Sequence, residues 1–237
     1  MIYARIKTVP LNQESIVKNT QFLQIQAYDH LIDAIKKGTL ETGHIYSLNQ
    51  MSKDMGISKT PLRDAVLRLE QERYIDILPS KGFVLHKMTT EDIIETYQIR
   101  AAIETYCLKE LSKNLNSPRG QAYYKKLSKK VELQHQIIEN NGSSEDFARK
   151  DYEFHRSIVQ YVDNASMLEM YRSFMYRIFW LNVTSFKKEG RMLDTVSEHE
   201  KLLCLIESQD SLALEDYLNN HLTIAQDINL DLLEDEV

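Results

Sequence analysis

The chain has 237 residues, of which 43% are hydrophobic and 27% are charged, and its formal net charge at pH 7 is −6. These values suit one or two globular domains with buried cores. No apolar run approaches the length of a membrane span, and the opening residues lack the apolar stretch of a signal peptide, so we expect a cytoplasmic protein with no membrane partner.

The charge is divided unevenly along the chain. Residues 1–88 carry twelve Lys and Arg against nine Asp and Glu, a net charge of +3, whereas the remainder carries seventeen against twenty-six, a net charge of −9. Positive charge confined to one part of a chain suits contact with a polyanion such as nucleic acid. We predict an N-terminal arm over residues 1–20, a basic domain over 21–88 and an acidic domain over 89–237.

The basic domain opens with three predicted helices. Apolar residues at helical spacing run from Gln21 to Lys37 and stop at Gly38. Ser47 is placed to cap a short second helix, and Gly56 then supplies a tight turn into the third. Helix, tight turn and helix in this order predict a helix-turn-helix.

The third helix has the features of a helix that enters DNA. It begins at Ser58 and takes Pro61 in its first turn, where the missing N–H of proline would have no partner in any case. Its apolar face is formed by Leu62, Val66 and Leu69. The N-terminal residues of such a helix meet base edges and phosphates. We therefore predict DNA contacts from Lys59, Thr60, Arg63 and Arg68, the last of which could instead brace the helix against the following hairpin.

A β-hairpin is predicted directly after this helix. Residues 74–78 and 83–85 have the composition of short strands, and Pro79-Ser80-Lys81-Gly82 between them is typical of a turn. A hairpin with a basic tip after a recognition helix makes a winged helix-turn-helix, in which Lys81 and Gly82 are placed to reach a groove or a phosphate.

The run from Ala27 to Leu85 resembles the N-terminal domain of GntR-type bacterial transcription regulators. The family pattern of small residue, Ser, Arg, Thr, Pro, aliphatic, Arg, acidic, Ala corresponds to Ile57 to Ala65. Two positions depart from it: Lys59 replaces the usual arginine, and Thr42 before Gly43 replaces a usual proline. Because lysine lacks the fork of arginine, Lys59 is expected to hold a phosphate or to read a base more loosely.

The acidic domain is predicted to be all-helical, which makes the whole chain mainly α. From Thr90 to Asp235 there is no convincing strand run, and Thr90-Glu91-Asp92 has the cap and early acids of a helix start. Breaks in the helical periodicity fall at residues 116–118, 140–144, 163–164, 187–191 and 208–211. They predict a bundle of six or seven helices.

The two cysteines, Cys107 and Cys204, fall within apolar helical patterns. We expect both to pack in the core rather than to form a disulfide or a redox switch.

One helix of this domain combines an apolar stripe with ionisable residues. Asp151 shares a helical face with Phe147, Phe154 and Ile158, and His155 lies one turn further along. A buried carboxylate is costly unless it is paired or binds a metal. The spacing suits either a hydrogen-bonded Asp-His pair or two ligands of one cation.

Two further histidines favour the cation. His199 and His221 both lie on apolar helical faces, and each is eleven residues from the turn near Asp210. On antiparallel helices this places both about 16 Å from the turn, at the same height. With Asp151 and His155 they form a set of nitrogen and oxygen donors that suits a divalent transition metal, with zinc as the first expectation and nickel, iron or manganese as alternatives.

A second resemblance covers Thr90 to Ile228. The phrases Asp151-Tyr152-Glu153-Phe154-His155, Asp163-Asn164 and Glu198-His199, followed by His221, resemble the all-helical ligand-sensing (FCD) domain of the FadR-like branch of GntR regulators. The resemblance implies a divalent cation held by Asp151, His155, His199 and His221. It also implies a small carboxylic or sugar acid bound beside the metal. Arg100 could hold the carboxylate of this effector, or it could form a salt bridge with Glu104.

We therefore expect a homodimeric transcription regulator, more commonly a repressor than an activator, that binds an inverted repeat in double-stranded DNA. Two alternatives remain open for the helical domain. It could be a metal-dependent hydrolase, although no motif such as His-Glu-x-x-His supplies a general base, so we predict no enzyme. It could also be a dimerisation module with a purely structural metal.

Overall fold

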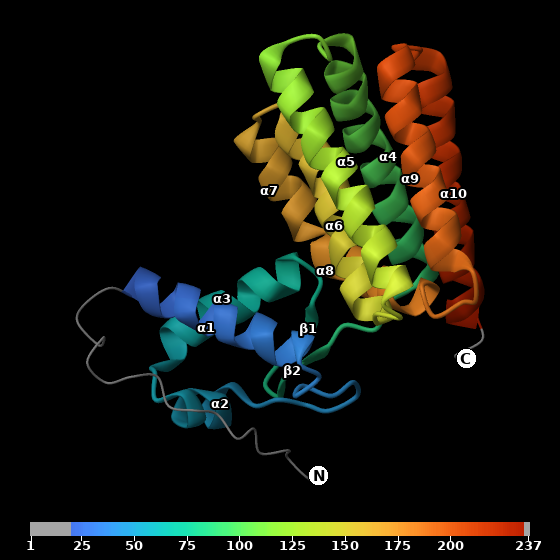
Figure 1. The fold of residues 1–237 in the computed structure, drawn as a ribbon. Coiled ribbons are helices and arrows are strands. Elements are labelled where there is room, and N and C mark those ends of the chain that lie inside the picture. The colour runs from blue at the N-terminus through green and yellow to red at the C-terminus, as the bar shows by residue number, and fades with distance from the viewer. Residues whose placement is uncertain (1–19, 235–237) are drawn as a thin grey trace. The chain divides into compact units, whose positions relative to one another are not determined.

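The computed structural model describes residues 20–234, apart from the side chains at positions 20, 21, 36, 175–178 and 180. Nearly all of the predicted N-terminal arm, residues 1–19, lies outside the described residues. The chain divides into two compact units, with the boundary between Lys87 and Met88 (Figure 1). Among residues 20–234, none of the helices combines the length and the hydrophobicity needed to cross a bilayer.

The first unit is the predicted winged helix-turn-helix. Its elements in chain order are α1 (Thr20–Lys36), α2 (Leu48–Met55), α3 (Lys59–Gln71), β1 (Ile75–Leu78) and β2 (Gly82–Leu85). The α1 and α3 helices pack together, and the two strands form an antiparallel hairpin in which Ile75 pairs with Leu85 and Leu78 with Gly82. Its fully buried side chains include Leu31, Leu62, Leu69 and Phe83.

Two glycines make the turns of this unit possible. Gly56 ends α2 in the left-handed conformation, at a φ of 67°, which lets the chain turn sharply into α3. Gly82 has a φ of 134°, and a Cβ added there would lie 2.0 Å from the carbonyl oxygen of Tyr46. Only glycine therefore fits where the wing crosses the segment before α2, to which Phe83 is joined by a two-way backbone bridge with Tyr46.

In its described part, up to residue 234, the second unit is a bundle of seven helices, in agreement with the predicted six or seven. They are α4 (Thr90–Lys113), α5 (Pro118–Glu139), α6 (Ser144–Tyr161), α7 (Ala165–Ser173), α8 (Met175–Ser185), α9 (Arg191–Ser208) and α10 (Ser211–Glu234). The α4 helix packs on α10, and α5 packs on α6 and α9 (Figure 1). The five predicted breaks are present, and a sixth, at Phe174, separates α7 from α8 without a glycine or proline to mark it.

Two details differ from the sequence prediction. The cap of α4 is Thr89 rather than Thr90, and it forms a reciprocal capping box with Asp92. Cys107 is buried as predicted, but Cys204 is exposed, so its prediction as a core residue was wrong. The apolar face of α9 passes through Leu202, Leu203 and Ile206, and Cys204 points away from it. Both thiols are free.

Candidate metal centre and nucleic-acid interface

The first unit carries a concave surface at the start of its recognition helix. This cavity, of about 530 Å³, is lined by the beginning of α2, by one face of α3 and by the wing. The predicted contact residues Lys59, Arg63, Lys81 and Gly82 all lie on it, and the three basic side chains are exposed. Thr60 is also exposed but is not part of the cavity wall. Positive side chains around a concavity of this kind suit the backbone and groove of duplex DNA.

Arg68 has a different position from the other predicted contacts. Its guanidinium carbon lies 4.0 Å from the centroid of the Tyr28 ring, and its Nε is 2.9 Å from Glu72 Oε1. The Tyr28 hydroxyl also donates to Glu72. Arg68 therefore stabilises the packing of α3 on α1. The alternative predicted from the sequence was that it supports α3 against the hairpin.

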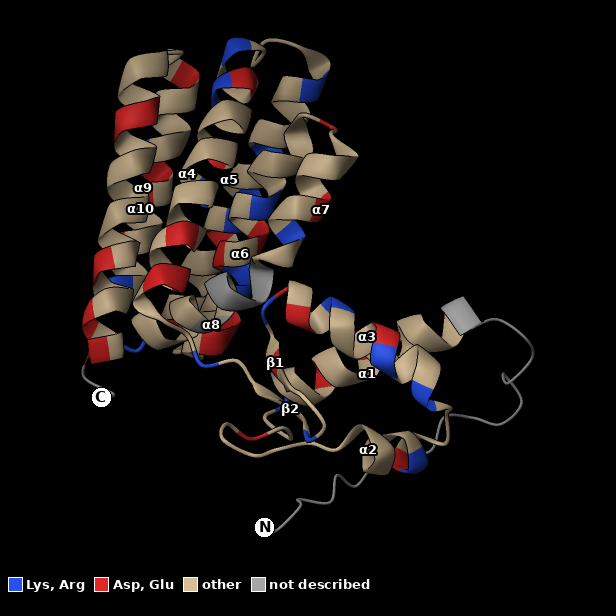
Figure 2. Cartoon of the chain, turned by 180° about the vertical axis from the view of Figure 1, so that it is seen from behind, with Lys and Arg blue, Asp and Glu red and all other residues tan. Residues whose placement is uncertain are grey.

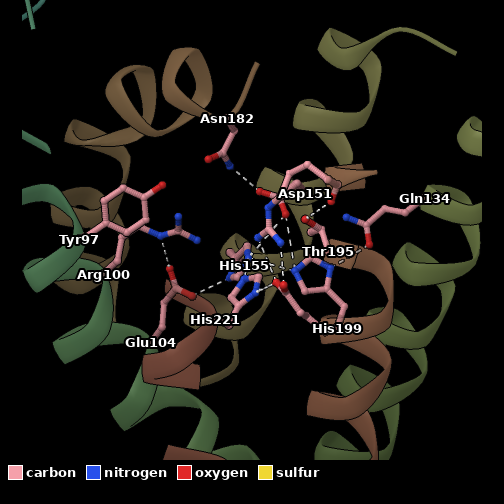
Figure 3. Close-up of polar contacts among 12 residues, drawn as sticks. Tyr97, Arg100, Glu104, Gln134, Asp151, His155, Asn182, Thr195, His199 and His221 are labelled. Atoms are coloured by element: carbon pink, nitrogen blue, oxygen red, sulfur yellow. Dashed lines mark hydrogen bonds and ion pairs between the residues drawn. The ribbon is translucent and has the colours of Figure 1, made fainter. Parts of the chain in front are cut away.

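The second unit brings the four predicted metal ligands together in its core (Figure 3). Asp151 and His155 come from α6, His199 from α9 and His221 from α10. The Nε2 atom of His155 lies 3.2 Å from Nε2 of both His199 and His221. Asp151 Oδ1 is 3.7 Å from Nε2 of His155 and 3.5 Å from Nε2 of His199.

Three of these four distances match the donor spacing around one small cation, and the distance of 3.7 Å between Asp151 and His155 is slightly longer. Ligands about 2.0–2.2 Å from a metal, at angles between octahedral and tetrahedral, lie roughly 3.0–3.5 Å from each other. All four side chains are at least 97% buried, so a cation between them would be shielded from bulk water. The chemistry of the donors, imidazole nitrogen with a carboxylate, also fits a divalent transition metal.

A second set of side chains orients the three imidazoles. In each ring Nδ1 is hydrogen-bonded to an oxygen: that of His155 to Glu104 at 2.6 Å, that of His199 to Gln134 at 2.9 Å and that of His221 to Glu198 at 2.5 Å. Because these oxygens accept, each Nδ1 carries the proton and each Nε2 presents a lone pair to the centre. Asn182 likewise donates to Asp151 Oδ2 at 2.5 Å.

Electrostatics favour the neutral form of His199 and His221, which is the form that binds a metal. Burial lowers the pKa of His199 well below its ordinary value, and the nearby His155 and His221 act in the same direction. Burial also lowers the pKa of His221, although its hydrogen bond with Glu198 opposes the shift. Burial alone would raise the pKa of Glu198, but hydrogen bonds from His221 and Arg191 outweigh it and lower the pKa to about 2.

Arg100 forms the salt bridge that was one of the two alternatives from the sequence, and it keeps one donor free. Its Nε donates to Glu104 at 2.8 Å, which is the predicted salt bridge. Its Nη2, however, is buried and has no hydrogen-bond partner within the described part of the chain. Arg100 lines a cavity of about 10 Å³, the room of about one water molecule, together with Asp151, His155 and His221. An unsatisfied guanidinium N–H beside the metal ligands is suited to receive an anion.

Several residues of this site were not predicted from the sequence: Gln134, Asn182, Arg191 and Glu198. Gln134 could have been noticed, because it continues the apolar stripe of Leu127 and Val131 on α5 as a polar residue. Asn182 and Arg191 could not have been noticed in this way, because the sequence around them does not indicate which residues their side chains contact.

A winged helix-turn-helix joined to a helical domain with a buried histidine and aspartate cluster is the architecture of a class of DNA-binding regulators. The family profile of bacterial regulatory proteins of the gntR family matches residues 23–85, and that of the FCD domain matches residues 95–223. The chain therefore belongs to the GntR family and carries an FCD domain. It is a DNA-binding transcription regulator rather than an enzyme.

Individual relatives agree with this assignment. The HTH-type transcriptional regulator YdhC of Bacillus subtilis is 21% identical over 197 residues, which cover 83% of this chain and 86% of the relative. The gluconate operon transcriptional repressor of the same species is 25% identical over 198 residues, covering 81% and 79%. The solved structure of McbR/YncC from E. coli has a TM-score of 0.67 at 19% identity, over 90% of this chain and 98% of that one. A metal-free FCD domain, from the regulator TM0439, has a TM-score of 0.51 at 19% identity, over 62% and 98%. These two structures share the fold.

Proposed function

We propose that this regulator is a homodimeric repressor whose helical domain binds a divalent transition metal, zinc by first expectation, and a small carboxylate that modulates operator binding. The main support is the convergence of three Nε2 lone pairs and one carboxylate oxygen in a buried site. Without a cation these groups repel one another, and a cation among them removes the repulsion.

Each surrounding side chain then has a definite task. Glu104, Gln134 and Glu198 hold the three rings, and Asn182 holds the aspartate. A bound metal would supply a Lewis acid that attracts the carboxylate of the effector. The free Nη2 of Arg100 would donate a hydrogen bond to the same carboxylate.

The small size of the cavity suggests how effector binding could affect DNA binding. A cavity of about 10 Å³ does not admit a carboxylic acid unless the helices around it move. Such repacking would alter the separation of the two DNA-binding domains in the dimer, provided that the effector binds one arrangement more tightly. A coupling of about 1–3 kcal/mol would be typical. A relative named for the gluconate operon supports sugar acids as the first compounds to test.

In the DNA-bound form, each subunit would place α3 in one half of an inverted repeat. Lys59, Thr60 and Arg63 would contact bases and phosphates from the helix, and Lys81 would do so from the wing. As a transcription regulator, the protein would work in the cytoplasm, where the bacterial chromosome lies.

Elemental analysis of the purified protein tests the metal. We expect about one transition metal per subunit, and loss of it in the Asp151→Ala/His155→Ala double variant. Metal absent from both samples after incubation with zinc, nickel and manganese would refute the site.

The effector is tested by titrating small carboxylic and sugar acids against a selected operator duplex. If no acid changes the affinity for DNA, the metal is purely structural and the helical domain is a dimerisation module.

A further inference from the structure

The helical domain has a second cavity next to the metal centre, and this one is open to solvent. Its volume is about 380 Å³, and it lies between the turn before α9, the first half of α9 and one face of α10. The α10 side is apolar, with Tyr217, Ile224 and Ile228, whereas the α9 side is polar. Among the residues that line this cavity, only Glu198 has a role in the function proposed above.

Arg191 lines both cavities, the open one and the small one at the metal ligands. It is 4% exposed, and it holds Glu198 through two bonds, of 2.6 Å from Nη1 and 3.0 Å from Nη2. The Glu198 oxygen that accepts from Arg191 Nη2, Oε2, also accepts from His221 Nδ1. The Arg191–Glu198 ion pair thus stands between solvent and the metal ligands.

The Arg191 side chain is not fully satisfied in this closed position. Its Nε is buried and has no hydrogen-bond partner among the described residues. An unpaired buried donor is unfavourable, and Nε would gain a hydrogen bond to water if the side chain turned outward. This gain offsets part of the cost of breaking the bonds to Glu198 when the side chain opens.

The charge around the open cavity suits a cation. Its acidic residues are Glu189, Asp194 and Glu198, and its basic residues are Lys188 and Arg191. Asp and Glu residues recur along α9 and α10 (Figure 2). A concave surface with a net negative charge raises the local concentration of cations and speeds their arrival.

We propose that this cavity is the entrance through which the divalent metal reaches its ligands, and that the Arg191–Glu198 ion pair is the gate of this entrance. The proposal rests on the metal site proposed above. In the open state the Arg191 side chain turns outward while Glu198 stays on His221, and the small cavity becomes continuous with solvent. Re-forming the ion pair encloses the metal.

A gate has a kinetic signature that distinguishes it from a residue that merely supports the site. Narrowing an entrance slows metal uptake and metal release by the same factor, so the dissociation constant does not change. Weakening the ligand geometry, in contrast, changes the dissociation constant.

Ser197→Trp provides the test. Ser197 is exposed on the rim of the open cavity, and its hydroxyl bonds only locally, to the Leu193 carbonyl. An indole there should partly fill the entrance. Ser208→Trp is the matched control, because Ser208 is an exposed serine at the far end of the same helix with the same kind of local bond, to the Leu205 carbonyl. Stopped-flow absorbance would follow Co²⁺ uptake by the apo full chain, and excess chelator would give the release rate.

We expect both rates to fall at least threefold in Ser197→Trp, with an unchanged dissociation constant, and to remain as in the wild type in Ser208→Trp. Arg191→Ala should raise the uptake rate and the release rate by the same factor, at least tenfold. Unchanged rates in Ser197→Trp, or a changed dissociation constant, would overturn the gate while leaving the metal site intact. Absence of equilibrium metal binding in the wild type would instead refute the proposed function, and the gate with it.

Discussion

Replacing Glu104 with glutamine tests how the ligands of the proposed metal centre are held in place. Glu104 is fully buried on α4, and its oxygens accept from Arg100 Nε at 2.8 Å, from His155 Nδ1 at 2.6 Å and from the Tyr171 hydroxyl at 2.8 Å. Burial opposes its ionisation, but Arg100 and His155 keep its pKa below the ordinary value. Glutamine preserves the shape of the side chain and removes its charge.

Two effects of Glu104→Gln follow from this geometry. Arg100 is only 2% exposed, so its charge would remain buried without a counter-ion. Removing one partner of a buried ion pair costs about 3–5 kcal/mol of unfolding free energy. The amide is also a weaker partner for His155, and disturbing such a contact lowers metal affinity about 10–100-fold.

Urea unfolding in the presence of a chelator measures the first effect. Trp180, the one tryptophan of the chain, lies in α8, so its fluorescence reports on the helical domain. Glu215→Gln is the control, because Glu215 pairs with Lys109 at 2.7 Å and both side chains are more than one-third exposed. Such a pair contributes at most about 1 kcal/mol.

A loss of stability in Glu104→Gln no larger than in this control, together with wild-type affinity for zinc, would contradict both expectations. Adding Arg100→Met to Glu104→Gln provides a second check. Removing the unpaired charge should recover part of the lost stability, because a buried ion pair can be replaced by apolar groups at little cost.

Four shorter predictions concern other parts of the molecule. His221→Ala should abolish the stabilisation of the wild type by zinc, which is about 2.7 kcal/mol at a hundredfold excess over the dissociation constant, and a retained thermal shift would exclude His221 as a ligand. Arg63→Ala should weaken operator binding by about 1–3 kcal/mol in fluorescence anisotropy while the protein stays folded, and unchanged affinity would remove Arg63 from the contact surface. A thiol reagent should label Cys204 in the native protein and Cys107 only after unfolding, because burial and then Glu104 raise the pKa of Cys107 to about 12; equal labelling rates would contradict this. Gly82→Ala should disorder the wing and weaken DNA binding, since its Cβ would clash with a backbone carbonyl, and wild-type affinity would argue against that constraint.

The sequence by itself determined the elements whose signals are local. Helix ends depend on a few adjacent residues, so Gly56 and Pro61 were enough to predict the turn and the start of the recognition helix. The wing followed from a turn sequence between two short strands. The equal spacing of His199 and His221 from one turn predicted that they would meet, because a helical hairpin has a fixed rise per residue.

Only the tertiary structure decided which side chains from different helices meet one another. Helical periodicity gives the face on which a residue lies, but it does not give the neighbouring helix that this face contacts. Gln134 meets His199 across 65 residues of sequence, and Glu104 meets His155 across 51. The sequence could not predict that Cys204 is exposed or that Arg191 lies between two cavities. Both facts depend on how α9 is rotated against the neighbouring helices, and long-range packing determines that rotation.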